Sequence, residues 1–392
     1  GKKYKAENFE KLTDIVEVWF DSGSTHSFVL EKRDDLKWPA SMYLEGSDQH
    51  RGWFHSSLLE SCGTRGRAPF ESILSHGFVM DGKGLKMSKS LGNQILPDDI
   101  LKKYGADILR VWVAASDYAE DLRIDYSILE QHAEAYRKIR NTFRYLMGNL
   151  NDNFSEQDYE KINFNNLPEL EQYMLHKLYV LNESFNKNFK SYNFHVLYKD
   201  LLNFCTVDLS SFYFDIRKDT LYCDKKNSDK RMNCILTLNI ILDGLLRWFA
   251  PILSFTTEEI FKLLNNDNSN SIHLKKFPKY PSSWKNEKLN SNWSKIINIR
   301  NNVNISIETK RAEKLIGSSL ETFVNITLNK DLYNLVKKYD FSEICITSGA
   351  NLILDEKIEE KIEVEALKAE GDKCSVCWKI SKHKCERHGN IQ

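Results

Sequence analysis

Two lysines in a polar, flexible setting are the first residues of this chain that could do chemistry. They belong to the pentapeptide Lys86-Met87-Ser88-Lys89-Ser90, which directly follows a glycine-rich turn at residues 81–84. Glycine adopts backbone conformations that other residues avoid, so the turn would allow this lysine loop (residues 86–90) to close over a ligand. Lysine ammonium groups there can hold polyphosphate oxygens while a bond to phosphorus breaks. The loop predicts phosphate chemistry, although a single short pentapeptide is more often a solvated turn.

The residues just before the lysine loop nearly match the P-loop pattern G-x-x-x-x-G-K-[ST]. The match runs over residues 77–84, and its last position holds Gly84. Glycine offers no hydroxyl for Mg²⁺ and disfavours the helix that a P-loop must open at this point. We therefore exclude a P-loop NTPase.

A second group of polar residues follows a short apolar stretch that ends near residue 45. The group comprises Glu45, Asp48, Gln49 and His50. Carboxylates there can hold an ammonium group or ribose hydroxyls, and the amide and imidazole can donate to a carbonyl or phosphate oxygen. Each residue alone is more often a loop or helix-cap residue. Together with the lysine loop they predict a nucleotide and amino-acid site.

The C-terminal tail carries a pattern typical of a metal site. Its two pairs, Cys374 with Cys377 and Cys385 with His388, are each separated by two residues. Such spacing lets one tight turn present both members of a pair to one ion, and four sulfur and nitrogen ligands complete a tetrahedral structural zinc site. His383 competes with His388 for the fourth position, and the alternative without metal is three reduced cysteines beside a surface histidine. We predict one structural zinc ion.

Length and composition limit the class of protein. A chain of 392 residues is expected to hold several domains, and its 55 basic and 55 acidic residues give a formal net charge of zero. Any contact with nucleic acid must therefore come from local patches. We expect no membrane span, because no apolar run is long enough, and a cytoplasmic location. Cys62, Cys205, Cys234 and Cys345 lie among apolar residues and are expected in the core.

The predicted elements place both polar groups at the edge of one sheet. Residues 13–20 read as a short buried strand, 42–45 as a second and 73–79 as a third, with a helix over about 52–62 before the third. Ligands of open α/β sheets bind beyond the carboxyl ends of parallel strands. This order predicts a parallel sheet of a nucleotide-binding type.

The middle of the chain predicts a helical bundle. Apolar residues recur at helical spacing from residue 128, and further helices are expected at 168–189, 193–214 and 229–249. Thr256 and Glu259 read as the capping box of one more helix, and the polar run 265–270 as a loop. A smaller α/β region follows, with a helix over 293–308 and strands at 323–328 and 344–347.

Four separated segments resemble class I aminoacyl-tRNA synthetases. The lysine loop matches the KMSKS signature of that class. The stretch Tyr43-Leu44-Glu45-Gly46-Ser47-Asp48-Gln49-His50-Arg51-Gly52-Trp53-Phe54 is similar to the isoleucyl-tRNA synthetases, as are residues 18–26. Residues 250–259 resemble the last-helix junction of the anticodon-binding bundle of this subclass, and residues 374–378 the zinc module of the bacterial isoleucyl enzymes.

The resemblance implies a multidomain fold that combines α/β and all-α parts. Residues 1–127 would form the C-terminal half of a Rossmann-type class I catalytic domain with the KMSKS loop. An α-helical anticodon-binding bundle would follow over 128–285, then a small α/β connective region over 286–365 and a zinc-binding tail over 366–392.

The resemblance also implies a reaction and its site residues. The enzyme would be an isoleucine-tRNA ligase that activates isoleucine with ATP and Mg²⁺ and transfers it to tRNA-Ile, as a monomer. Lys86 and Lys89 would stabilise the leaving pyrophosphate, with Met87 and Ser88 beside them at the ATP. The adenylate pocket would be lined by Glu45, Gly46, Asp48, Gln49, His50 and Trp53.

Two features depart from the family pattern. The 392 residues contain neither the histidine motif of the HIGH type nor an editing domain, so we expect the C-terminal part of a longer protein, inactive by itself. His388 stands where a fourth cysteine is usual. The rival readings are a non-catalytic tRNA-binding protein derived from a synthetase, and a class I synthetase for valine, leucine or methionine.

Overall fold

The computed structural model describes residues 3–150, 154–155, 157–265, 269–359 and 361–389, which form two compact units. The first unit extends to Lys102 and includes Ser116–Leu129; the second comprises Lys103–Ala115 and the chain from Glu130 onward. The division near residue 129 lies close to the first predicted domain boundary. All the predicted domain boundaries, at residues 127, 285 and 365, stay predictions.

The predicted strand, helix and strand of the first unit are present. Strand β1 (Tyr43–Gly46) pairs in parallel with β2 (Ile73–His76), and helix α2 (Trp53–Arg65) connects them. In the register of this pair, Gly46 lies opposite His76, so both strands end at the same edge. A parallel pair needs a crossover connection of this kind. The polar residues after β1 are therefore placed at the carboxyl edge that the sequence predicted.

The third predicted strand is divided in two. After His76 the chain leaves β2, and β3 (Val79–Asp81) pairs instead with β4 (Leu122–Ile124) in a separate parallel ladder. At the break, the Gly77 N–H donates to the Tyr118 carbonyl (2.9 Å), and a Cβ atom on Gly77 would lie 2.3 Å from the Glu120 carbonyl oxygen. A continuous strand over 73–79 was wrong because this close backbone approach redirects the chain.

The prediction of a buried strand over residues 13–20 was also wrong. Its second half opens helix α1 (Val18–Gly23), which the Glu17 carboxylate caps by accepting from the Trp19 and Phe20 backbone N–H groups. The side chains of residues 13–20 are exposed. A short apolar run cannot distinguish strand from helix, and here a local cap decides.

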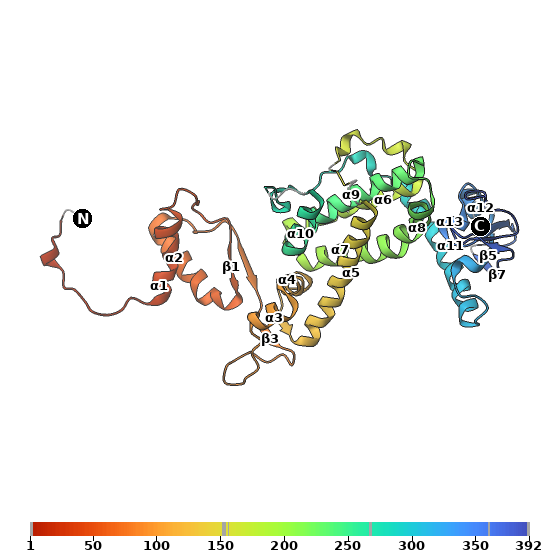
Figure 1. Cartoon of the computed structure of the whole chain (residues 1–392). Helices are drawn as coiled ribbons and strands as arrows, with labels where there is room; N and C mark the ends of the chain where they lie inside the picture. Colours follow the sequence, from red (N-terminus) through yellow and green to blue (C-terminus); the bar gives the residue numbers. More distant parts are fainter. Residues whose placement is uncertain (1–2, 151–153, 156, 266–268, 360, 390–392) are drawn as a thin grey trace. The chain divides into compact units, whose positions relative to one another are not determined.

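The helical bundle is formed by long helices with apolar stripes, and α5 to α10 are gathered together in Figure 1. The predicted stripe of the first helix is confirmed, because Leu129, Ile139, Phe143 and Leu146 are all buried. The predicted helix over 193–214 continues as α7, a π-helical segment and α8. Helix α3 (Pro97–Tyr104) precedes the bundle in the chain. The helices around this core are α4 (Ala106–Ala115), α5 (Tyr126–Leu150), α6 (Glu169–Lys190), α7 (Phe194–Asn203), the π-helical Phe204–Tyr213, α8 (Phe214–Cys223), α9 (Asp229–Phe249) and α10 (Ser254–Asn265).

Helix α10 begins at Ser254 and not at the predicted capping box. Thr256 lies inside the helix, where its backbone N–H and hydroxyl donate to the Asp107 carboxylate at 2.8 and 2.6 Å. The Phe255 N–H donates to the same carboxylate (3.2 Å). An acid from a distant helix thus satisfies the first N–H groups of α10, which a local pattern cannot show. The predicted loop at 265–270 lies partly outside the described residues.

Helix α9 is long and apolar enough by composition to be a candidate membrane span, which the sequence analysis did not expect. Of the candidate stretch, 72% is buried inside the protein. The helix packs against α6, α8 and α10. Its apolar surface is therefore covered by the bundle itself.

A buried ion pair lies where the bundle meets the α/β region. The Arg217 guanidinium on α8 donates through Nε and Nη2 to the Glu171 carboxylate on α6, both at 2.6 Å, and through Nη1 to Glu343 at 2.6 Å. Tyr213 also donates to Glu171 (3.1 Å), and burial raises the pKa of its phenol well above the usual value. Both carboxylate oxygens of Glu171 are thereby satisfied although its side chain is fully buried.

The α/β region contains one mixed sheet in the order β6-β5-β7. Strand β5 confirms the predicted strand at 323–328, but the predicted strand at 344–347 was wrong. There α13 ends and the chain turns through Ile346, at φ 58°, before β6 starts. The elements are α11 (Glu287–Ala312), β5 (Thr322–Leu328), α12 (Lys330–Val336), α13 (Phe341–Ile344), β6 (Gly349–Leu354) and β7 (Glu363–Lys368).

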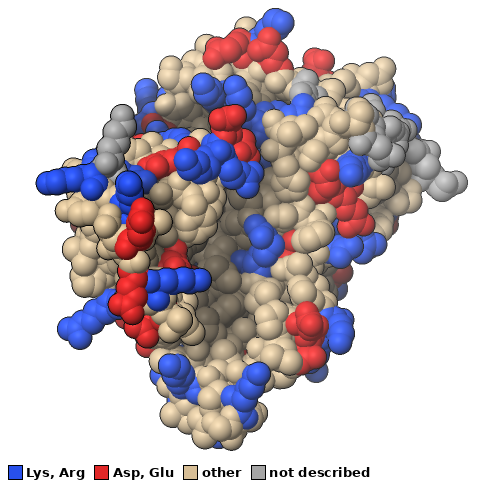
Figure 2. Space-filling view, turned by 90° about the vertical axis from the view of Figure 1, so that its left-hand side faces the viewer, with Lys and Arg blue, Asp and Glu red and all other residues tan. Residues whose placement is uncertain are grey.

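The cysteines outside the tail are all free thiols. Cys205, Cys234 and Cys345 are buried as predicted, and burial raises the pKa of each thiol to about 12. Cys62 is exposed, so its assignment to the core was wrong: it lies on a face of α2 that no described element covers. Charged side chains of both signs are scattered over the face shown in Figure 2, as expected for a chain with zero net charge.

We expect Glu171→Gln to destabilise the second unit strongly. The substitution removes one of the two carboxylate charges that face the buried Arg217 guanidinium. Breaking a buried pair costs about 3 kcal/mol or more of unfolding free energy. Urea unfolding followed by circular dichroism measures this. The control is Glu183→Gln, which breaks an exposed pair with Lys285 and should leave the midpoint nearly unchanged. Equal midpoints for the two variants would contradict the assignment of the buried pair.

Candidate functional site

The residues after β1 form a short 3-10 turn, Ser47–Arg51, that leads into α2. Glu45, Asp48 and His50 have exposed side chains, whereas Gln49 is half-buried. The Gln49 side-chain oxygen accepts from the Trp53 backbone N–H (2.8 Å), and the Glu45 carboxylate accepts from the Gly46 N–H (3.1 Å). Gln49 therefore serves the start of α2, while Asp48 and His50 remain accessible to a ligand.

Trp53 is held from two sides. Its ring stacks on Tyr43 with centroids 4.2 Å apart and planes 9° apart, and its indole N–H donates to the Ser22 carbonyl (3.0 Å). The Tyr43 hydroxyl pairs with Ser57 (3.1 Å), whose hydroxyl lies 3.5 Å from Nδ1 of the buried His26. Residues 18–26 thus support the segment after β1. The sequence analysis named His26 within a resemblance but assigned it no structural role.

The lysine loop is organised by Asp81 at the end of β3. The Asp81 carboxylate accepts from the Lys83 N–H (3.0 Å) and the Leu85 N–H (2.8 Å), and from the side-chain amide of Asn93 (2.9 Å). The Asn93 amide lowers the pKa of Asp81 below its ordinary value, as do the two backbone donors. Gly84 adopts φ 82° inside this turn, a conformation that favours glycine.

Asn93 closes the other side of the loop. Its side-chain oxygen accepts from the Ser88 N–H (2.9 Å), and its amide also donates to the Lys86 carbonyl (3.3 Å). The sequence analysis missed Asn93 and treated Asp81 only as part of a turn. The signal it could have used is an aspartate at the start of a glycine-rich turn, since such side chains commonly accept from backbone N–H groups two residues on.

Lys86 and Lys89 both project from this loop with exposed side chains. Within the described part of the chain, neither forms an ion pair, and no hydrogen bond joins the lysine loop to residues 45–53. The two groups belong to the same compact unit. Each is held by contacts of its own, so both can reorganise around a ligand.

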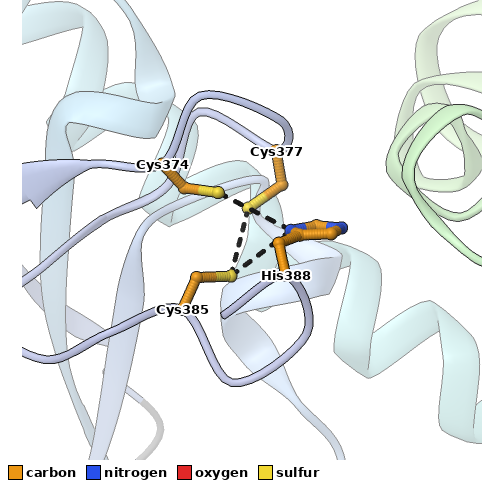
Figure 3. Close-up of side chains that lie close together, drawn as sticks. All are labelled: Cys374, Cys377, Cys385 and His388. Carbon is orange, nitrogen blue, oxygen red and sulfur yellow. Dashed lines mark hydrogen bonds between the residues drawn. The ribbon is translucent and has the colours of Figure 1, made fainter. Parts of the chain in front are cut away.

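The tail brings Cys374, Cys377, Cys385 and His388 together (Figure 3). Their ligand atoms all lie within 4.8 Å of one another. His383 is exposed and does not belong to this metal cluster. Of the two histidines that the sequence left open, the structure brings His388 to the three cysteines, and its role as a ligand stays a prediction.

The spacing of the metal cluster fits a tetrahedral zinc ion. Zn–S bonds of about 2.3 Å would separate two sulfur ligands by about 3.8 Å. The Sγ atoms of Cys377 and Cys385 lie 3.8 Å apart, and His388 Nδ1 lies 3.6 Å from Cys374 Sγ and 3.4 Å from Cys385 Sγ. The Cys377 backbone N–H lowers the pKa of the Cys374 thiol to about 6, which favours the thiolate that binds metals.

Comparison with known proteins places two parts of the chain in one class of protein. Residues 2–125 match the family "tRNA synthetases class I (I, L, M and V)", and residues 171–326 match the "Anticodon-binding domain of tRNA ligase". The lysine loop and the residues after β1 lie within the first match, and most of the bundle lies within the second. The chain is thus built as part of a class I tRNA synthetase.

Full-length relatives identify the member of that class. An isoleucine–tRNA ligase of Pelagibacter ubique (strain HTCC1062) is 69% identical over 390 residues, which are 100% of this chain and 43% of the relative. Another, from Mesorhizobium japonicum, is 48% identical over 88% of this chain and 34% of its own. The chain belongs to the isoleucine–tRNA ligase family, and it spans less than half the length of these relatives.

Among solved structures, the ternary complex of Agrobacterium radiobacter K84 agnB2 LeuRS-tRNA-LeuAMS aligns with a TM-score of 0.48 at 15% identity. The alignment covers 74% of this chain and 31% of the other. A TM-score of this size does not by itself establish a common fold.

We expect Asn93→Ala to loosen the lysine loop without unfolding the unit. The substitution removes the acceptor of the Ser88 N–H and one donor to Asp81, so the amide hydrogens of Ser88 and Leu85 should exchange with solvent several-fold faster. Hydrogen–deuterium exchange measures this at peptide resolution. Gln94→Ala changes the exposed neighbouring residue and serves as the control. Unchanged exchange in the Asn93 variant would show that other contacts hold the loop.

Proposed function

We propose that the protein containing this chain activates isoleucine with Mg·ATP and transfers it to tRNA-Ile. The observation that carries the proposal is the 69% identity, over the whole chain, to a relative named isoleucine–tRNA ligase. The site supports it, because two accessible ammonium groups and a row of accessible polar side chains belong to the same unit.

In the proposed first step, an isoleucine carboxylate oxygen attacks the α-phosphorus of ATP. The bond from that phosphorus to the bridging oxygen of the β-phosphate breaks, and pyrophosphate leaves. Lys89 and Lys86 stabilise the negative charge that grows on the leaving group, with Met87 and Ser88 beside the nucleotide. No protein nucleophile is required, because positioning and electrostatics supply the rate.

In the second step, a hydroxyl of the terminal tRNA ribose attacks the acyl carbon and AMP leaves. We assign Glu45 to contact with the isoleucyl-adenylate and Gly46, Asp48, Gln49, His50 and Trp53 to the same pocket. The accessible carboxylates of Glu45 and Asp48 suit a ligand that carries an ammonium group and ribose hydroxyls. The stacked ring of Trp53 gives the pocket a rigid wall.

The remaining parts take supporting roles in the proposal. The bundle over 128–285 binds the tRNA anticodon, the connector over 286–365 positions the tail, and the metal cluster holds one structural zinc ion. When bound, zinc would cross-link the two halves of the tail, and no open ligand position is needed. The proposal includes a cytoplasmic, monomeric protein.

We expect Lys89→Ala to lower amino-acid-dependent ATP–pyrophosphate exchange by roughly 10²–10³-fold, the usual cost of removing a group that stabilises transition-state charge. The experiment uses the full-length protein and compares isoleucine, valine, leucine and methionine. Lys83→Ala removes an exposed lysine of the preceding turn and is the matched control.

Exchange strongest with isoleucine and lost only in the Lys89 variant would support the proposal. Strongest exchange with another of the four amino acids would assign a different synthetase. Exchange with none of them would leave a non-catalytic tRNA-binding protein as the better account.

We expect the purified protein to carry zinc in the metal cluster. Elemental analysis should show one equivalent fewer in Cys374→Ser and in His388→Ala than in the unchanged protein, because each variant lacks one ligand. His383→Ala is the matched control and should retain the full content. Equal zinc content in all four proteins would contradict the assignment.

A further inference from the structure

Behind the metal cluster, the end of α8 touches the histidine ligand itself. Nδ1 of His388 faces the sulfur atoms, and Nε2 lies 3.1 Å from the carbonyl oxygen of Cys223, the last residue of α8. Because Nε2 then carries the proton, the tautomer is set and Nδ1 is left free to bind a metal. The acceptor is one of the carbonyls that a helix leaves unpaired at its C-terminus, where the helix dipole is negative.

The residue next to this ligand is anchored to the same helix end. The Arg387 guanidinium donates to Asp219 on α8 and to Asp224 just beyond it, the latter at 2.6 Å. Asp219 and Asp224 are both partly buried. The guanidinium thus donates to two carboxylates at once. This arrangement is stronger and more directional than an isolated surface ion pair.

The segment that carries the first pair, Cys374 and Cys377, contacts α8 and also other elements of the second unit. The thiol of Cys223 lies 3.7 Å from the carbonyl of Val376, between the two ligands of the first pair. After the first pair, Lys379 donates to Ser342 (3.0 Å), and the Ile380 N–H donates to Ser348 (2.7 Å). The first pair therefore has attachments besides α8.

The second pair has fewer attachments. The small hairpin of β8 (Asp372–Lys373) and β9 (Ile380–Ser381) brackets the first pair only. Among the described residues, Cys385 and His388 are joined to the rest of the protein through the metal cluster and through the α8 contacts of Arg387 and His388. A metal ion and the end of α8 consequently act on the same short segment.

We propose that the C-terminal end of α8 is part of the metal site, so that zinc binding and attachment of the tail to the bundle form one coupled equilibrium. This rests on the proposed zinc site. The Cys223 carbonyl orients His388, and Asp219 with Asp224 fix Arg387, so these are positioning groups and not ligands. Zinc in turn holds the imidazole against α8, and its loss frees the last turn of the helix as well as the tail.

The test uses the full-length protein, with zinc as the ion and two readouts other than activity. Zinc release to a chromophoric chelator is timed for the double variant Asp219→Asn/Asp224→Asn and for Arg387→Gln, which leaves α8 unaltered. Loss of groups that orient a ligand weakens metal sites by about 10–100-fold, so release should be at least about tenfold faster. Asp158→Asn, which breaks the exposed pair with Lys161, is the matched control. Cys374→Ser identifies which zinc signal belongs to the tail.

The second readout is hydrogen–deuterium exchange with and without zinc. In the unchanged protein, zinc removal should speed exchange at residues 220–224, which are the last turn of α8 and the residue after it, as well as in the tail. In the double variant, α8 should respond less to zinc, because only the contact between His388 and the Cys223 carbonyl is left to join them. Unchanged release in both variants, or no response of residues 220–224, overturns the coupling and leaves the zinc proposal intact. A tail that binds no zinc overturns both.

Discussion

The buried pair of Arg217 and Glu171 is the interaction on which the second unit depends. Taking two charges out of water costs several kcal/mol for each ion, and only close, directional contacts offset that cost. Here the guanidinium meets Glu171 through two bonds of 2.6 Å and reaches Glu343 through a third. Because these contacts require close and directional geometry, they restrict how α6, α8 and α13 can pack without leaving a buried charge unpaired.

Helix α8 connects this ion pair to the tail. Arg217 fixes its first half in the core, and its second half presents Asp219 and the Cys223 carbonyl to the residues around the metal cluster. The distance between the ion pair and the cluster is therefore set by a rigid helix rather than by a loop. Because a short tail has too little apolar surface to form a core, we expect it to be ordered by the fixed end of α8 and by the proposed metal ion.

The first unit is ordered by a different kind of interaction. Its candidate chemistry lies on loops, and each loop is ordered by one or two side chains that satisfy backbone N–H groups. Asp81 and Asn93 do this for the lysine loop, and Gln49 for the start of α2. Such contacts define a conformation at low cost, and they can be exchanged for contacts with a bound nucleotide. Exposed lysines on a loop of this kind suit a function in which charge must move towards a leaving group.

Several elements of this protein can be predicted from short sequence patterns. The helical stripe from Leu129 onward, the parallel pair around Glu45 and the spacing of Cys374 and Cys377 all depend on residues that are near one another in the sequence. Periodicity and turn geometry act over such distances, so these elements were predicted correctly. The ligand roles and the domain boundaries inside the second unit stay predictions.

The remainder was decided by contacts between distant residues. Thr256 is 149 residues from the carboxylate of Asp107 that replaces its expected cap, and Arg217 is 126 residues from Glu343. His388 lies against the Cys223 carbonyl across more than 160 residues, whereas His383 is exposed. The sequence by itself determined the family, the periodic elements and the candidate ligands. Tertiary structure alone decided where helices begin, which histidine joins the metal cluster and which side chains order the loops, since hydrogen bonds depend on distance in space and not along the chain.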